Sequence, residues 1–324
     1  MSKKRKIAFF GSDSIALPCL DALTELSGDF EICGVLTQPD RPVGRGRKLQ
    51  SNPIKNWAKE KHLPIMDPEK PGSQIIDWLS ELGADISIVM AYGHILKEEI
   101  LYASPLGCFN LHASLLPKYR GASPIETALA MGEKETGLTL MRVIPQMDAG
   151  PVVDFEKVSI LSTDTGISLR EKISHACVPL LLRSLPTLFS KSFLESSQDE
   201  ERVSYCRKLN KEDGQLDFSL SAEEIECRFR AFTGWPGTWF LHNDTCLKVG
   251  KLCLSKEKLD LKPGVRSAEK KDSLIVGTGD GAVELLELQK PGGKMMAVSD
   301  FLRGYPLPTH VTFPANLEKI TLVR

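Results

Sequence analysis

The sequence predicts an α/β fold in which a doubly wound, mostly parallel sheet is followed by a smaller β-barrel domain. The N-terminal half alternates short apolar runs with amphipathic helical patterns, which is typical of a parallel sheet covered by helices. The C-terminal third alternates short strand patterns with turn residues, which is typical of a small barrel. A chain of 324 residues also exceeds the usual size of a single core, which favours two domains.

The chain opens with a β-α-β pattern. Residues 7–10 form an apolar strand, residues 12–14 offer N-caps for a helix to about residue 27, and residues 31–37 form a second strand. Such a unit predicts parallel strands joined by a right-handed crossover. The turn after the first strand lacks a G-x-G-x-x-G fingerprint, so a dinucleotide cofactor and a nicotinamide-dependent dehydrogenase are poorly supported.

A basic segment follows at residues 38–48. Its prolines and glycines predict irregular structure, and it carries four cations, Arg41, Arg45, Arg47 and Lys48. One interpretation is a mobile, solvated surface loop, and the other is an arm that contacts phosphate groups. Because the net charge of the whole chain is -1, any polyanionic partner has to be held by a local patch of this kind.

The first domain continues the alternation and ends in a polar stretch. The predicted elements are helices at 51–61, 73–82 and 123–131, strands at 85–92 and 137–143, and a long helix at 165–190 that is broken near Pro179 and Pro186. The polar stretch has few apolar residues, as expected of a linker. We therefore predict a first domain over residues 1–192, a linker over 193–207 and a second domain over 208–324.

The second domain begins with a helix and continues as strands. Residues 221–224 have the form of a capping box, which predicts a helix to about residue 232. Strand patterns follow at 238–242, 246–254, 273–276, 282–288 and 320–323. The glycine-rich run at 277–281 looks like a phosphate loop, but no helical pattern follows it, so we predict a hairpin turn.

The candidate site begins at Asn110 and His112, which follow the predicted end of a buried strand. Side chains two residues apart in a strand point to the same side, so we expect an amide donor and an imidazole on one face. Open α/β sheets bind ligands where their parallel strands end. This pair suits carbonyl chemistry. The alternative, which the spacing leaves open, is that both side chains only bind backbone groups of the loop.

A carboxylate for this histidine is available at Asp148, in the turn-rich run 145–151. A histidine that acts as an acid or base usually needs a carboxylate to fix its tautomer. An aspartate in such a turn is also a common Asx-turn former, and the spacing does not decide between the two roles. His94 follows the strand 85–92 at the same edge, where we favour a packing or capping role over chemistry.

Composition excludes several classes of protein. The eight cysteines are scattered without a C-x-x-C pair, which predicts reduced thiols in a cytoplasmic protein and no zinc or other metal site. The apolar run at 7–10 is too short for a secretory signal. The sequence also lacks the roughly 20-residue apolar span of a membrane helix, so we expect no membrane partner.

Taken together, these motifs resemble the signatures of the folate-dependent formyltransferases. The segments that carry the resemblance are 110–112, 114–125, 137–150, 208–211 and 217–236, and the basic segment 38–48 is similar to an inserted loop. The resemblance therefore covers nearly the whole chain. One departure is the turn at 11–14, where the family usually has a proline, and this puts only the local turn in doubt.

The resemblance implies a Rossmann-like catalytic domain followed by an open, OB-like barrel that helps to hold tRNA. It implies that a monomer transfers the formyl group of 10-formyltetrahydrofolate to the amino group of methionine on initiator Met-tRNA, without a metal. By matching position, the catalytic residues would be Asn110, His112 and Asp148, the folate site would be lined by Ser114, Leu115, Leu116 and Pro117, and the tRNA would be bound by Arg41, Arg45, Arg47 and Lys48.

Two alternatives remain open at this point. The chain could formylate a small amine, such as a glycinamide nucleotide or an amino-sugar nucleotide, although such acceptors need neither the basic segment nor a barrel. It could also be a tRNA-binding module without catalysis, which an assay for formylated product distinguishes.

Overall fold

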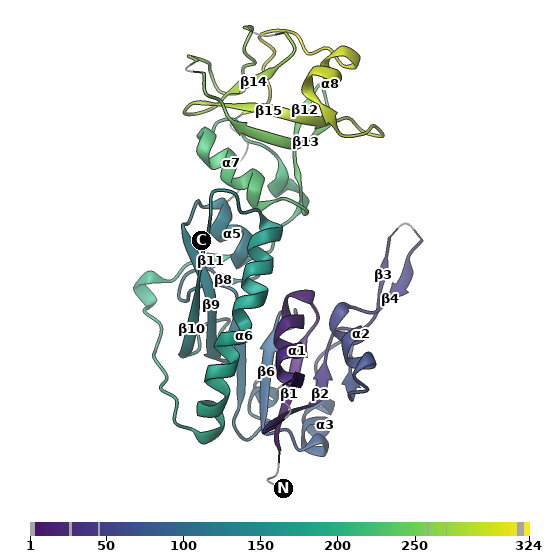
Figure 1. Cartoon of the computed structure of the whole chain (residues 1–324), viewed down its shortest axis with the longest axis vertical. Coiled ribbons are helices and arrows are strands. Elements are labelled where there is room, and N and C mark those ends of the chain that lie inside the picture. The colour runs from purple at the N-terminus through teal and green to yellow at the C-terminus, as the bar shows by residue number, and fades with distance from the viewer. Residues whose placement is uncertain (1–3, 26–27, 45, 258, 270, 316–320) are drawn as a thin grey trace. The chain divides into compact units, whose positions relative to one another are not determined.

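The computed structural model describes residues 4–25, 28–44, 46–257, 259–269, 271–315 and 321–324. The chain forms two compact units (Figure 1). The first comprises Met1–Gly121, Glu135–Ser159 and Arg170–Tyr205, and the second comprises Ala122–Lys134, Ile160–Leu169 and Cys206–Arg324. Neither unit is therefore continuous in sequence.

A seven-stranded sheet forms the centre of the first unit. Its strands, in spatial order, are β10 (Val152–Ser159), β9 (Glu135–Arg142), β7 (Cys108–His112), β6 (Ile86–Met90), β1 (Arg5–Gly11), β2 (Phe30–Leu36) and β5 (Ile65–Met66). The five strands from β7 to β5 pair in parallel, while β9 and β10 join antiparallel. The predicted doubly wound, mostly parallel sheet is confirmed. Its central strands read as continuous apolar runs because helices cover the faces of such sheets.

The helical segments of the first unit are η1 (Ser14–Ala16), α1 (Leu17–Glu25), α2 (Pro53–Glu60), α3 (Gln74–Leu82), α4 (Glu98–Leu101), most of α6 (Gly166–Ser190) and η2 (Glu200–Arg202). The predicted N-cap at Asp13 is confirmed, since its carboxylate accepts from the Ile15 N–H. The predicted break of the long helix is wrong. Helix α6 continues through Pro179 and Pro186, and buried leucines on either side compensate for the two missing N–H groups.

The basic segment is a β-hairpin rather than an irregular loop, so that prediction is also wrong. Strands β3 (Arg41–Val43) and β4 (Lys48–Gln50) pair antiparallel, and the hairpin projects from the first unit (Figure 1). Gly44 and Arg47 at its turn both have positive φ, which suits a tight hairpin connection. Composition misled the prediction because the same glycines that exclude a helix allow such a turn.

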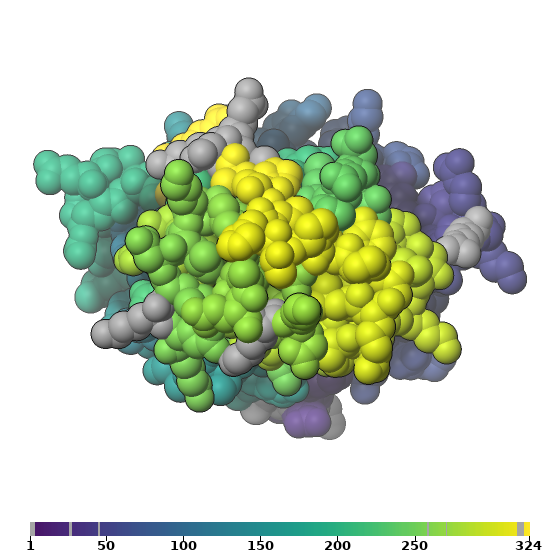
Figure 2. Space-filling model, turned by 90° about the horizontal axis from the view of Figure 1, so that it is seen from above, coloured from purple at the N-terminus to yellow at the C-terminus, as the bar shows by residue number. Residues whose placement is uncertain are grey.

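The second unit contains a five-stranded antiparallel sheet with helices packed on it. Its strands are β12 (Thr238–His242), β13 (Thr245–Leu254), β15 (Ala282–Gln289), β14 (Leu274–Gly277) and β16 (Met296–Ala297). Its helical segments are α5 (Pro124–Ala130), η3 (Lys211–Gly214), α7 (Ala222–Ala231) and α8 (Val298–Gly304). The core between sheet and helices includes Phe218, Phe240 and Phe313. Figure 2 shows part of the surface of the C-terminal segment of this unit in green and yellow.

Two local predictions for this unit are confirmed. Ser221 and Glu224 form the expected capping box at the start of α7. The run 277–281 is the predicted hairpin turn, in which the Thr278 N–H donates to Gly281 O. The predicted strand at 320–323 is not formed at residues 321–323. Val323 makes only one isolated bridge, to Cys206, and residue 320 lies outside the described residues.

In the described part of the chain, no helix is both long and apolar enough to span a membrane. The eight cysteines, all of which lie within the described residues, form no disulfide.

Candidate active site

Strand β7 presents Asn110 and His112 on one face. The strand continues through His112, three residues beyond its predicted end, because β9 pairs with it on one side as far as the pair His112 and Thr139. The intervening side chain of Leu111 points to the opposite, buried face. The sequence-predicted pair is therefore held by a central strand of the sheet rather than by a loop.

The carboxamide of Asn110 is half-buried and has no hydrogen-bond partner among the described residues. The alternative that Asn110 binds backbone groups of the loop therefore does not hold within the described residues. Because a carboxamide can donate two hydrogen bonds, this side chain is available to a carbonyl or oxyanion of a ligand.

The imidazole of His112 is buried and has two neighbours. Its Nε2 lies 2.9 Å from the carbonyl oxygen of Tyr119. Since a carbonyl oxygen only accepts hydrogen bonds, Nε2 is the protonated nitrogen. Its Nδ1 lies 3.7 Å from Asp148 Oδ2, which is within ion-pair range but too long for a hydrogen bond. Tyr119 thus fixes the tautomer, a role that the sequence had suggested for Asp148.

Asp148 reaches the site from the turn between β9 and β10. Its backbone is left-handed, with φ of 50°, and its Oδ2 accepts a 2.8 Å hydrogen bond from the N–H of Gly121. The carboxylate therefore bonds a residue 27 positions away rather than its own turn. Asn110 and His112 come from β7 and Asp148 comes from the turn after β9, and the structure brings His112 and Asp148 together.

The segment predicted to line a folate site follows β7 directly. Ser114 is fully buried, and its hydroxyl donates to Lys118 O at 2.6 Å. Thr139 supports the same segment, because its hydroxyl bonds both Ser114 O and the Leu116 N–H. Ser114 thus serves the shape of the loop, whereas Leu115, Leu116 and Pro117 are partly exposed.

The basic hairpin carries exposed cations. Arg41, Arg47 and Lys48 are exposed, and Arg41 pairs with Glu69 at 2.9 Å. Arg45 lies outside the described residues. No hydrogen bond or ion pair of the described residues joins the hairpin cations to Asn110 or His112.

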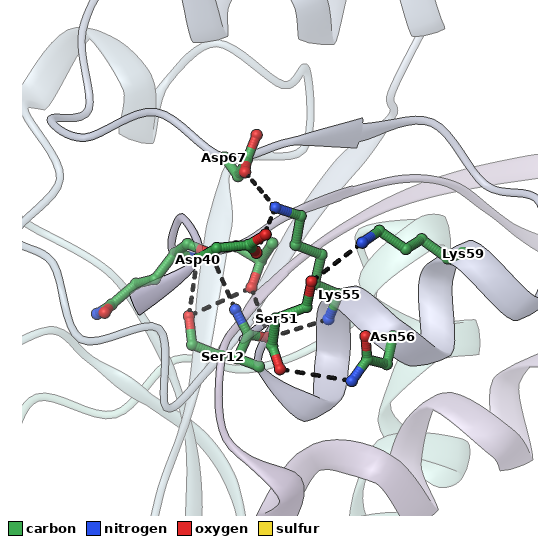
Figure 3. Close-up of polar contacts among 10 residues, drawn as sticks. Ser12, Asp40, Ser51, Lys55, Asn56, Lys59 and Asp67 are labelled. Carbon is green, nitrogen blue, oxygen red and sulfur yellow. Dashed lines mark hydrogen bonds and ion pairs between the residues drawn. The ribbon is translucent and has the colours of Figure 1, made fainter. Parts of the chain in front are cut away.

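A lysine fixes the base of this hairpin (Figure 3). Lys55 Nζ lies 2.6 Å from both Asp40 Oδ1 and Asp67 Oδ2, and only 12% of its side chain is exposed. The hydrogen bond from Lys55 lowers the pKa of Asp40 below its ordinary value. Burial lowers the pKa of Lys55, but its hydrogen bonds to the two aspartates outweigh this and raise the pKa. Lys55 and Asp40 are therefore both charged at neutral pH.

The chain next to the hairpin is tied to the ends of β1 and β6. Ser12 Oγ donates to Tyr92 O at 3.1 Å and accepts from the Gln38 N–H, and the Gln38 carboxamide also donates to Tyr92 O. His94 packs edge-on against the Tyr92 ring, as the predicted packing role requires. Burial raises the pKa of Tyr92 to about 12, so this phenol is neutral.

Sequence reasoning missed several residues of this site. The carbonyl of Tyr119 and the N–H of Gly121 contribute through the backbone, so no side-chain pattern marks them. Arg120 lies in the segment 114–125, which carries part of the family resemblance, and Gln198 lies in the predicted linker. The described residues contain no group of three or more His, Cys, Asp or Glu side chains that could hold a metal ion.

Comparisons with known proteins show the family to which the chain is related. The formyl transferase family matches residues 5–185, and the formyl transferase C-terminal domain matches residues 208–306. A methionyl-tRNA formyltransferase of Sulfurihydrogenibium sp. (strain YO3AOP1) is 36% identical over 305 residues, which cover 93% of this chain and 97% of the relative.

Two solved structures share the fold. An N-formyltransferase from Helicobacter canadensis, solved with folinic acid and dTDP-3-aminofucose, has a TM-score of 0.67 and 22% identity, over 89% of this chain and all of that one. HypX from Aquifex aeolicus has a TM-score of 0.61 and 17% identity over 94% of this chain, which spans about half (48%) of HypX. On the family match and the full-length relatives, this chain belongs to the formyl transferase family.

Proposed function

We propose that this protein transfers the formyl group of 10-formyltetrahydrofolate to the α-amino group of methionine on initiator Met-tRNA. The observation that carries the proposal is the similarity along almost the whole chain to relatives named methionyl-tRNA formyltransferase. The proposal treats the protein as a cytoplasmic monomer. Residues 1–192 hold the reacting groups, residues 193–207 link the two domains, and residues 208–324 help to bind the tRNA.

Asn110 acts on the formyl carbonyl in this proposal. The lone pair of the methionine amine attacks the formyl carbon, and the carbonyl oxygen becomes an oxyanion in a tetrahedral intermediate. The carboxamide of Asn110 donates a hydrogen bond to that oxygen. Because this carboxamide makes no hydrogen bond with the described residues, none of those bonds has to break when the oxyanion forms.

His112 and Asp148 handle the proton that the attacking amine loses. Because Nε2 carries the hydrogen bond to Tyr119 O, the neutral imidazole has its lone pair on Nδ1, on the side of Asp148. The amine proton passes to this lone pair, and the nearby carboxylate of Asp148 stabilises the imidazolium that results. When the bond from carbon to folate N10 breaks, N10 takes up a proton and the carbonyl re-forms on the new amide.

The two substrates meet different parts of the chain. Leu115, Leu116 and Pro117 contact the folate, and Ser114 holds their loop in shape. The N-formyltransferase from Helicobacter canadensis, which was solved with folinic acid, supports a folate donor. The cations of the basic segment, Arg41, Arg45, Arg47 and Lys48, contact the phosphates of the tRNA.

A product assay with different acceptors tests the proposal. The protein is mixed with 10-formyltetrahydrofolate and initiator Met-tRNA, and in parallel with a glycinamide nucleotide and an amino-sugar nucleotide. We expect formylmethionyl-tRNA to form and the small amines to stay unmodified. Formylation of a small amine alone would contradict the acceptor that we propose, and the absence of any product would contradict catalysis.

A further inference from the structure

The carboxamide of Gln198 joins three segments of the first unit. Its Nε2 donates to the carbonyl oxygens of Asp148 and Gly150, both at 2.8 Å. Its Oε1 accepts from Nε of Arg120 at 3.0 Å. The opposite placement of oxygen and nitrogen would put an acceptor against two carbonyls and a donor against a donor, so only one orientation of the amide satisfies these neighbours.

Gln198 is the one residue of the stretch 194–200 that is not exposed. Within this stretch of the predicted linker, Ser196 exchanges two backbone hydrogen bonds with Val152 of the first unit. An otherwise exposed segment that turns a single polar side chain inward, and satisfies both ends of it, holds that side chain for its contacts.

Arg120 holds the other end of this carboxamide. The guanidinium is buried and donates to Glu200 Oε1 at 2.8 Å and to the Tyr205 hydroxyl at 3.2 Å, in addition to Gln198. Burial lowers the pKa of Arg120, but its hydrogen bonds to Glu200 and Tyr205 outweigh this and raise the pKa. Because this planar fork is fixed at every nitrogen, it also fixes the direction of the Gln198 amide.

The residue that these contacts act on is Asp148. A left-handed backbone is less favourable for a residue that carries a Cβ than for glycine, so φ of 50° at Asp148 needs support from its surroundings. The preceding residues 145–147 are exposed and give little support. The two hydrogen bonds from Gln198 hold the backbone at Asp148 and Gly150, and the Gly121 N–H donates a hydrogen bond to the Asp148 carboxylate.

We propose that Gln198 is a positioning residue for formyl transfer: together with Arg120, it fixes the turn that carries Asp148 and so holds the Asp148 carboxylate beside His112. This inference deepens the proposed function and rests on it. The polar stretch between the two family matches is then part of the catalytic machinery. The identity of the side chain at Gln198 matters to the reaction, and not only the length of the stretch.

The first test needs no substrate. Gln198→Met keeps the length of the side chain and removes its polar atoms, and Gln198→Glu keeps the shape but places oxygen against two carbonyls. In both variants we expect amide hydrogen exchange in peptides covering 119–123 and 145–152 to become about three- to tenfold faster, as for the loss of one or two net hydrogen bonds. The matched control is Gln74→Met, an exposed glutamine that donates to the backbone of its own helix entry, at Lys70 O.

The second test measures turnover. We expect kcat for formylation of Met-tRNA to fall about tenfold or more in Gln198→Met, with KM for both substrates changed little, because the reacting groups are misplaced rather than the binding contacts. If Gln198 acts through Asp148, then adding Gln198→Met to Asp148→Asn should slow that variant by no more than about twofold. A merely structural role of Gln198 would lower kcat by the same factor in the wild-type and Asp148→Asn backgrounds.

Each outcome decides one question. Exchange or kcat like the wild type in Gln198→Met would overturn the inference, as would equal losses in the wild-type and Asp148→Asn backgrounds. Wild-type behaviour in Gln198→Glu would also overturn it, because shape alone would then suffice. If the wild-type protein made no formylmethionyl-tRNA, the proposed function would fail, while the exchange measurement would still test whether Gln198 fixes the turn.

Discussion

Among single residues, the carbonyl oxygen of Tyr119 decides which nitrogen of His112 carries a proton. Tyr119 has φ of 59°, a left-handed conformation that turns its carbonyl toward Nε2 of the imidazole. The consequence is that the lone pair of the neutral ring faces Asp148. In the proposed mechanism, this leaves Nδ1 of His112 to accept the amine proton and the Asp148 carboxylate to stabilise the cation that results.

The first prediction concerns Asn110. Because its carboxamide makes no hydrogen bond with the described residues, Asn110→Ala should leave the melting temperature unchanged. Steady-state turnover should fall by about 10² or more, as for the removal of other oxyanion donors. Calorimetry and formylation kinetics on the same preparation check both parts. Wild-type turnover in this variant would remove Asn110 from the mechanism.

The residue pairs of the site show how far sequence reasoning reaches. Asn110 and His112 share a face because strand geometry has a period of two, so their relation follows from spacing alone. Asp148 could be named from the resemblance, but its distance from His112 depends on a turn closed by Gly121 and Gln198. Those contacts join residues 27 and 50 positions away, and local pattern carries no information about them.

Among the helices and strands, the β3–β4 hairpin depends on the helix that follows it. Lys55, in α2, bonds Asp40 just before the hairpin and Asp67 after β5, so a single ammonium group joins three segments (Figure 3). The sequence predicted the helix and the cations of the hairpin but not their connection. The hairpin itself was missed because glycine and proline content signals turns without showing which strands they join.

The second prediction removes this connection. Lys55→Met should raise KM for Met-tRNA about threefold or more, as for the loss of a charged hydrogen bond, while KM for the folate donor stays constant. The matched control is Lys59→Met in the same helix, because Lys59 donates only to the Ser51 hydroxyl among the described residues. Equal effects of the two variants on KM for tRNA would show that Lys55 has no special role in presenting the hairpin.

The third prediction concerns the cations themselves. When a side chain that binds one phosphate is removed from a nucleic-acid complex, the slope of log K against log salt falls by about 0.7 to 0.9. We expect this reduction for tRNA binding in Arg41→Ala and in Lys48→Ala, both of which are exposed on the hairpin. Lys157→Ala, which breaks a surface ion pair with Glu135 elsewhere, serves as the control. An unchanged slope in both hairpin variants would exclude phosphate contacts by these residues.

Over the whole molecule, the two units are interleaved along the chain. Helix α5 and the first residues of α6 group with the C-terminal segment, although they lie within the sequence of the first domain. Periodicity found these helices but not their grouping, because an apolar face does not say which surface it packs against. The predicted boundaries at residues 192 and 208 therefore stay a prediction about which part of the chain performs which function.

The fourth prediction links the stability of the first unit to pH. Burial raises the pKa of Asp154 in β10, but hydrogen bonds from Arg183 in α6 and from the Phe155 N–H outweigh it and lower the pKa. A carboxyl with a lowered pKa in the folded state stabilises above its unfolded pKa near about 3.9, and this contribution is lost as the pH falls through the folded value.

Arg183→Met should therefore lower the melting temperature by about 1 to 2 °C at about pH 7, since both partners are partly exposed and water screens the pair. The difference from the wild type should shrink as the pH falls below about 3.9. Arg303→Met, which removes a more exposed pair with Asp300, should have no effect. A difference that stayed constant down to about pH 2 would contradict the assignment to Asp154.

Single-turnover formylation of initiator Met-tRNA is the sharpest test of the proposed reaction and of the residues assigned to it. The protein is held in excess over Met-tRNA with saturating 10-formyltetrahydrofolate, and the rate of formylmethionyl-tRNA formation is compared between the wild type, His112→Ala and Asp148→Asn. We expect rapid conversion by the wild type and rates lower by a factor of about 10² or more in the two variants, as for the removal of acid–base groups. No conversion by the wild type, or a wild-type rate in His112→Ala, would contradict this mechanism.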